Sequence, residues 1–266
     1  MRRFLIIASA CLLLGDTANA WEWPAQVRVD YRELGELGKA GEFSAMEKAI
    51  LSSLPKWEAL GGPWYGHLML RAVQRLATDE FDESEKVKPL AMELARRALR
   101  RPGNLCIEDQ VDLTLSLQMS LIKPWRQEDW VQKRGSDARL WLETWKRLDE
   151  VIDPDWVPEK TYWNMAPPGM PSATQPEDIE DPGLRAKFEA ALAENERKAQ
   201  RNSEQMRTRR LMKSFHPWAK RYLTKLYSHP PYAVDELEQL LKEYVADEQA
   251  RSEILSSVTS AMEANR

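Results

Sequence analysis

The sequence predicts an all-α protein, and three observations support this fold class. Charged residues make up 30% of the 266 residues, which favours helix over sheet, while a hydrophobic content of 43% is enough to form a packed core. Only 11 residues are glycine, whereas Ala, Leu, Glu, Lys and Arg, which favour helix over sheet, are abundant. No segment offers a credible partner strand for another. We expect a solenoid-like array of helical hairpins, a Pro-rich connector, a long charged helix and a small C-terminal helical region.

Two helices are expected first. Proline favours the first turn of a helix, so Pro24 predicts a helix that runs to about Gly38. Ser44 and Glu47 have the spacing of a capping box, which predicts a second helix over 45–54. We expect that helix to end at the following proline, because the residue before a proline disfavours helical geometry.

The next two helices are separated by an acidic linker. The break at 61–63 predicts a helix that continues to about residue 77. The linker covers 79–85, and a helix over 89–101 follows, with an apolar face and arginines in its last turns. Pro102-Gly103-Asn104 is expected to stop it.

Residues 111–121 fit two structures. Apolar and polar residues alternate along them, which is typical of a strand. The same residues also form a wide helical face in which Leu and Met dominate. We predict a buried helix, because a strand without a partner leaves its backbone polar groups unsatisfied.

Two helices and the connector complete the middle of the chain. A short helix is expected over 125–133, and Ser136 is expected to cap another over 137–152. Repeated prolines across 153–182 predict a long extended connector.

The last third of the chain is again helical. A helix is expected from 182 to about 214, with an almost entirely polar middle. Pro217 predicts a kink or restart before 218–227. Two final helices are expected over 234–244 and 247–263.

The first twenty residues have the three parts of a secretory signal peptide. Arg2 and Arg3 precede a short apolar run over 4–14, and Ala18-Asn19-Ala20 forms a small-x-small cleavage site. The run is too short for an anchored helix, which needs about 20 apolar residues. We expect cleavage after Ala20, export to the periplasm or the medium, and no transmembrane anchor.

These features divide the chain into four parts. They are the signal peptide (1–20), a helical-hairpin domain (21–152), the Pro-rich connector (153–182), and the long helix with the C-terminal helical region (183–266).

Two stretches have the small and apolar residues that let paired helices approach closely. The first contains Gly41, Phe43, Met46 and Ile50, and the second contains Ala91, Ala95, Ala98, Leu99 and the turn at 102–104. Within residues 25–122 these stretches resemble tetratricopeptide helical repeats, although the chain has no clean 34-residue period. The resemblance implies a scaffold that binds peptides or proteins along a concave surface.

The usual sequence signatures of catalysis are missing. His67, His216 and His229 have no metal-ligand spacing, and no nucleophile elbow, phosphate loop or C-x-x-C motif occurs. Cys106 is the only cysteine beyond the signal peptide, and we expect it to be a buried thiol. We therefore expect no metal and no cofactor. The formal net charge of −4 argues against nucleic acid as a partner.

Tryptophan gives the candidate binding residues. Six of the 11 tryptophans are concentrated in the middle of the chain: Trp125, Trp130, Trp141, Trp145, Trp156 and Trp163. Exposed indoles there would stack on sugars, with Asp129, Glu143 and Glu159 as available carboxylates. The alternative, which we favour, is that the indoles pack helices together and anchor the connector.

The resulting functional prediction is a non-enzymatic binding or scaffolding protein of the cell envelope, with another envelope protein or a peptide as its partner. The alternative is an envelope hydrolase that acts on glycan. A third possibility is an oligomer in which the long helix pairs with its own copy, although the interrupted apolar stripe argues against a regular coiled coil.

Overall fold

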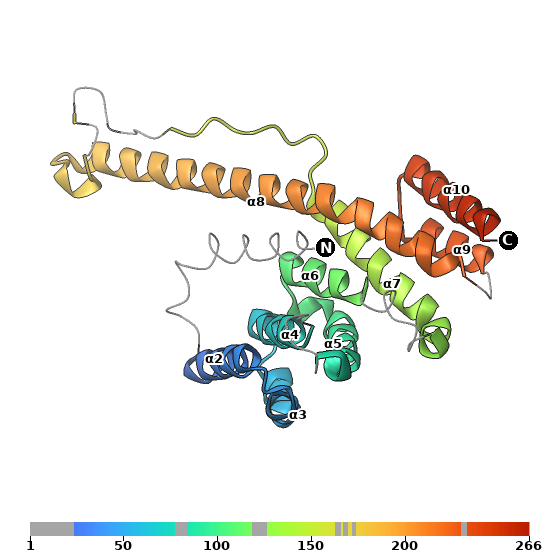
Figure 1. The fold of residues 1–266 in the computed structure, drawn as a ribbon. Coiled ribbons are helices and arrows are strands. Elements are labelled where there is room, and N and C mark those ends of the chain that lie inside the picture. Colours follow the sequence, from blue (N-terminus) through green and yellow to red (C-terminus); the bar gives the residue numbers. More distant parts are fainter. Residues whose placement is uncertain are drawn as a thin grey trace. The chain divides into compact units, whose positions relative to one another are not determined.

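The described part of the chain is helical. The computed structural model describes residues 24–77, 84–118, 127–162, 166, 170–171, 174–229 and 233–265. All regular elements in these ranges are helices and none is a strand, which confirms the all-α prediction there (Figure 1). The predicted signal peptide lies outside the described residues. No described helix is both long and apolar enough to cross a membrane.

The chain forms two compact units. Unit 1 combines the residues up to Arg147 with those from Phe215 onward, and unit 2 is Leu148–Ser214. The C-terminal helices therefore belong to the same unit as the N-terminal helices, whereas the sequence grouped them with the long helix.

The N-terminal half of unit 1 is built around one central helix. Its helices are α2 (Ala25–Ala40), α3 (Phe43–Leu60), α4 (Gly62–Leu76), α5 (Ser84–Leu99) and α6 (Ile107–Ser116). Helix α4 contacts the other four, and α3 also contacts α5 (Figure 1). Tyr65, Leu68 and Met69 of α4 are completely buried, so this helix supplies much of the local core.

Helix α3 corrects two expectations about its ends. Ser44 does not cap it, because α3 already begins at Phe43, and Pro55 lies inside it. The proline removes the hydrogen bond to the Leu51 carbonyl, but Leu51 is 50% exposed, so water can reach that group. Beyond the proline, Trp57 is buried and its indole nitrogen donates to Asp30 Oδ2 at 2.8 Å. Burial of this side chain favours continuing the helix.

Helix α6 settles the strand-or-helix alternative for the described residues. It is a helix over Ile107–Ser116, and residues 119–121 lie outside the described part. The misleading alternation arises because a polar position is buried: Thr114 has no exposed surface, and its hydroxyl bonds to the Gln110 carbonyl and to the Thr144 hydroxyl at 2.7 and 2.9 Å. Polar residues therefore do not mark a solvent face here.

Helix α7 (Gln127–Val151) is continuous, so the predicted break before Ser136 is wrong. Arg134 and Asp137, on either side of the expected break, are both buried. Gly135 between them lies against Glu236 of α9 (Val234–Tyr244), where a Cβ would collide with the carboxylate. The glycine therefore allows two helices to approach and does not end α7.

Helix α8 (Pro182–Tyr227) is also continuous, and the predicted restart at Pro217 is wrong. The carbonyl that loses its hydrogen bond belongs to Lys213, an exposed residue. Phe215 and Ala219 on either side are completely buried, so packing holds the helix together across the proline.

The last two helices match their predictions within one residue. They are α9 and α10 (Glu248–Ala264), which contact each other; Leu237 and Leu241 of α9 and Ile254 of α10 are completely buried. Asp247 caps α10 by accepting from the backbone of Gln249 at 2.9 Å.

Candidate binding surfaces

The structure describes the side chains of three of the six candidate tryptophans. Trp125 and Trp163 lie outside the described residues, and Trp130 lies in α7 without a described side chain. Trp141, Trp145 and Trp156 are 0%, 2% and 6% exposed. These three indoles therefore do not present open faces to solvent.

Trp141 and Trp145 of α7 stack on aromatic side chains of the C-terminal part of α8, within unit 1. Trp141 stacks on Phe215 and Tyr222 with ring centroids 5.2 and 4.4 Å apart. Trp145 stacks on His216 at 3.8 Å, with the rings almost parallel. Burial and the nearby Lys220 lower the pKa of His216 to about 4, so its imidazole is neutral near pH 7. The aromatic faces that a sugar would need are occupied by these contacts.

A buried ion pair lies beside this aromatic cluster. Arg96 of α5 is 3% exposed and forms a bidentate pair with Asp137 of α7, with distances of 2.7 and 2.8 Å. The Tyr222 hydroxyl donates to Asp137 at 3.5 Å. Sequence reasoning assigned Arg96 to the last turn of a helix and missed this partner, which lies 41 residues away.

Unit 2 holds Trp156 against the long helix. The Arg209 guanidinium lies 4.9 Å from the centre of the Trp156 ring and donates to the Trp156 carbonyl at 3.0 Å. Trp156 begins an extended segment, residues 156–162, that runs beside α8 (Figure 1). The predicted anchoring of the connector by an indole fits this contact.

Side chains of α8 bind the main chain of this extended segment at regular intervals. The Glu159 carbonyl accepts from Asn202, and the Tyr162 carbonyl accepts from Asn195, at 2.7 and 3.0 Å. With Arg209 and Trp156, the bound carbonyls are three residues apart and their donors on α8 are seven residues apart. Three extended residues and seven helical residues both span about 10 Å, so each donor on α8 lies beside its carbonyl on the extended segment.

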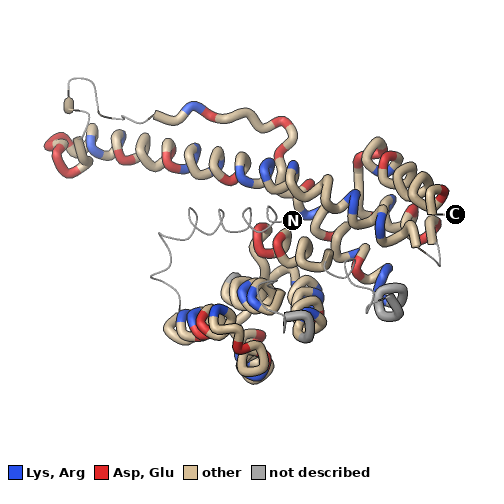
Figure 2. The backbone as a smooth tube through the Cα atoms, viewed as in Figure 1, with Lys and Arg blue, Asp and Glu red and all other residues tan. Residues whose placement is uncertain are grey.

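The remaining surface of α8 in unit 2 is charged. Lys and Arg alternate with Asp and Glu along it (Figure 2). Arg197 and Lys198 both pair with Glu194, and Arg201 lies 3.4 Å from Asp153. Exposed pairs of this kind contribute little to stability and keep the helix solvated.

Helix α4 carries a single accessible stripe, which we call the α4 stripe. From residue 64 to residue 76 all other positions are buried, and the partly exposed ones are Trp64, His67, Arg71, Gln74 and Arg75. Their spacing of three and four residues places them on one side of the helix. A helix that is otherwise part of the core thus presents aromatic and cationic groups to solvent.

One end of the α4 stripe contacts α6. His67 Nδ1 lies 3.1 Å from Asp109 Oδ2, and Asp109 is 3% exposed. Gly66 makes room for this carboxylate, because a Cβ there would lie 2.8 Å from it. Cys106 accepts from the Asp109 backbone, and burial raises the pKa of the Cys106 thiol, so the thiol stays protonated.

The other end of the α4 stripe contacts α2. The Arg71 guanidinium lies 4.7 Å from the centre of the Tyr31 ring. A Cβ at Gly35 would lie 2.6 Å from Arg71 Nη2, and one at Gly38 would lie 2.7 Å from Arg75 Cδ. The two glycines therefore form the surface on which the two arginines rest.

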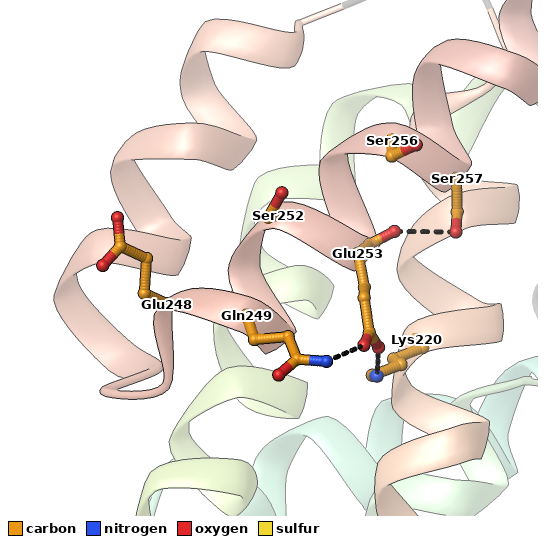
Figure 3. A pocket seen from close by; sticks show the side chains of 7 residues that line it. All are labelled: Lys220, Glu248, Gln249, Ser252, Glu253, Ser256 and Ser257. Atoms are coloured by element: carbon orange, nitrogen blue, oxygen red, sulfur yellow. Dashed lines mark hydrogen bonds and ion pairs between the residues drawn. The ribbon is translucent and has the colours of Figure 1, made fainter.

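The open pockets are formed by polar groups that bind one another. In the pocket between α8 and α10, Glu253 pairs with Lys220 and accepts from Gln249 at 3.1 Å, while Ser257 donates to the Glu253 carbonyl at 2.7 Å (Figure 3). A smaller pocket lies beside Gly135 between α7 and α9. Among the described residues, no group of His, Cys, Asp or Glu side chains could hold a metal ion.

No known protein family, curated protein or solved structure matches the chain.

Proposed function

We propose that this protein is an exported, non-enzymatic binding or scaffolding protein of the cell envelope, with another envelope protein or a peptide as its partner. The observation that carries the proposal is the α4 stripe. Aromatic and arginine side chains are enriched where proteins bind one another. The N-terminal twenty residues support export.

We propose further that α2 to α6 form a short array of helical hairpins. Successive helices contact each other, and so do the alternate pairs α2 with α4, α3 with α5 and α4 with α6. Such contacts are expected when hairpins stack in a solenoid. The repeat-like residues Phe43, Met46, Ala91 and Ala95 are buried between these helices, which also supports the proposal. In this arrangement α2, α4 and α6 share one face, with the α4 stripe at its centre.

A glycan-acting hydrolase is the second candidate, and the raised pKa of Glu143 is the observation that favours it. Burial raises the pKa of Glu143; the nearby Arg139 opposes this shift, and Glu243 adds a smaller rise. A raised pKa is the property of a general acid. Glu159, another of the carboxylates considered, pairs with Arg201 at 3.6 Å. Release of sugar from cell-wall glycan, lost in Glu143→Gln, would favour this candidate over the first.

Photo-crosslinking in the source cells tests the binding proposal. A photoreactive amino acid replaces Gln74 on the α4 stripe or, as the control, Ser203 on the exposed side of α8. We expect a specific envelope protein or peptide to be captured from position 74 and not from position 203. The same sample gives the N-terminus of the exported form, which we expect to be Trp21. Retention in the cytoplasm, or identical captures from both positions, would contradict the proposal.

A further inference from the structure

Arg71 and Arg75 are two neighbouring cations on α4 for which the described residues supply no counter-charge. Neither forms an ion pair within the described part of the chain, and the Nε of each is buried without a hydrogen-bond partner. Side chains four residues apart on a helix are neighbours, so the two positive charges lie close together. Burial, with a contribution from Arg75, lowers the pKa of Arg71. An anion between the two guanidinium groups would relieve this unfavourable arrangement.

The pair is also held in position before any ligand arrives. Arg71 is stacked over Tyr31, and both side chains rest on the glycines of α2. Fixing an arginine in this way reduces the side-chain entropy that binding would otherwise cost. The planar guanidinium group can donate two parallel hydrogen bonds to a carboxylate. The arrangement therefore combines uncompensated charge with preorganised donors.

We infer that Arg71 and Arg75 form a binding site for the carboxylates of an acidic peptide segment. The inference rests on the proposed function, because it names the chemistry that the α4 stripe recognises. The formal net charge of −4 makes the whole protein repel a highly charged polyanion. A peptide that carries a few carboxylates can contact the arginines with little of that repulsion. The neighbouring Trp64 and Gln74 offer apolar and hydrogen-bonding contacts to the rest of the peptide.

Fluorescence anisotropy with the purified protein tests this site. The probe is a labelled peptide with blocked ends in which Glu alternates with Gly, and the matched probe has Gln at every Glu position. The variants are Arg71→Gln and Arg75→Gln. Arg32→Gln is the control, because it removes the same charge from α2, where Arg32 is largely exposed and lies 3.9 Å from Glu36.

We expect the Glu peptide to bind at least about tenfold more tightly than the Gln peptide, and each site variant to lose about tenfold in affinity. The Arg32→Gln variant should change the affinity less than about twofold. Circular dichroism checks the fold of each variant. If the glutamine variants unfold, Arg71→Lys and Arg75→Lys keep the charge but lose the planar fork, and should still weaken binding.

Equal binding of the two peptides, or affinity that does not depend on Arg71 and Arg75, would overturn the inference. Capture of an envelope partner from position 74 that is unaffected by Arg71→Gln would leave the proposed function standing and remove only the carboxylate site. Binding of the Glu peptide that depends on Arg71 and Arg75, without any partner captured in cells, would support the carboxylate site and contradict the proposed function.

Discussion

Asn202 holds both main-chain polar groups of Glu159. Its Oδ1 accepts from the Glu159 N–H at 3.0 Å, and its Nδ2 donates to the Glu159 carbonyl at 2.7 Å. Asn195 makes the same pair of bonds with Tyr162, at 2.8 and 3.0 Å. Each amide side chain thus replaces the neighbouring strand that an extended segment would need in a sheet.

Removing one of these amides should release the extended segment locally. Asn202 is 9% exposed, so Asn202→Ala leaves two backbone groups of Glu159 poorly satisfied. We expect the free energy of local opening at residues 156–162 to fall by about 1–3 kcal/mol, measured by amide hydrogen exchange. Gln200→Ala, an exposed substitution two residues away on the same helix, is the control. Unchanged exchange in Asn202→Ala would show that these hydrogen bonds do not hold the segment.

Asp112 should make the protein less stable as the pH rises. Burial, together with Asp109 and Glu108, raises the pKa of Asp112 to about 7. The folded state therefore keeps a proton that the unfolded state releases near pH 4, and stability falls between about pH 4 and pH 7. We expect Asp112→Asn to stabilise the protein above pH 7 and to have little effect below pH 4. Urea unfolding across this range measures the difference, with Glu196→Gln on the exposed side of α8 as the control.

His216 should produce the opposite dependence. Its lowered pKa means that the unfolded state takes up a proton near pH 6.5 while the folded state resists until about pH 4. Stability is therefore lost as the pH falls through this window, by about 1.4 kcal/mol per pH unit at most. His216→Phe keeps a ring against Trp145 and should abolish this loss. The His229→Gln variant, at an exposed position, should still lose stability as the pH falls. If both variants became equally insensitive to pH, His216 would not be the source of the dependence.

The Arg96–Asp137 pair should be costly to break and inexpensive to replace. Arg96→Met alone leaves the Asp137 carboxylate charged in a buried site, and we expect a loss of about 3–5 kcal/mol. Asp137→Leu alone should cost a similar amount because it strands the guanidinium group. The double variant removes both charges and should recover most of the stability. Equilibrium unfolding of the unsubstituted protein, the two single variants and the double variant gives the coupling free energy between Arg96 and Asp137. If the two single losses simply added in the double variant, the prediction would be wrong.

The sequence predicted helices well where local signals and packing agree. Helix α9 begins and ends where expected, and Asp247 marks the start of α10. The errors fall at Pro55, Pro89, Gly135 and Pro217, which lie inside continuous helices; α5, for example, begins at Ser84, before the expected start at Pro89. In each case buried neighbours on both sides favour continuing the helix, and that burial depends on contacts with distant segments.

The candidate sites were less accessible to sequence reasoning. The four-residue spacing of Trp141 and Trp145 is enough to put them on one face of a helix, but it could not show which aromatic side chains cover that face. Arg71 and Arg75 were recognisable as helix neighbours, whereas their fit to the glycines of α2 requires the packed structure. The seven-residue spacing of Asn195, Asn202 and Arg209 on α8 is present in the sequence. Amphipathic analysis looks for repeated apolar residues, so it does not detect a repeat of polar ones.

The matched repeats in unit 2 constrain how this part of the protein can change in evolution. Inserting one residue between Asn195 and Asn202 would turn one amide about 100° away from the other, so that only one could still reach the connector. Three residues added to the extended segment would stay in register only if seven were added to the helix. Connector and helix can therefore lengthen or shorten only together, in a fixed ratio of three to seven.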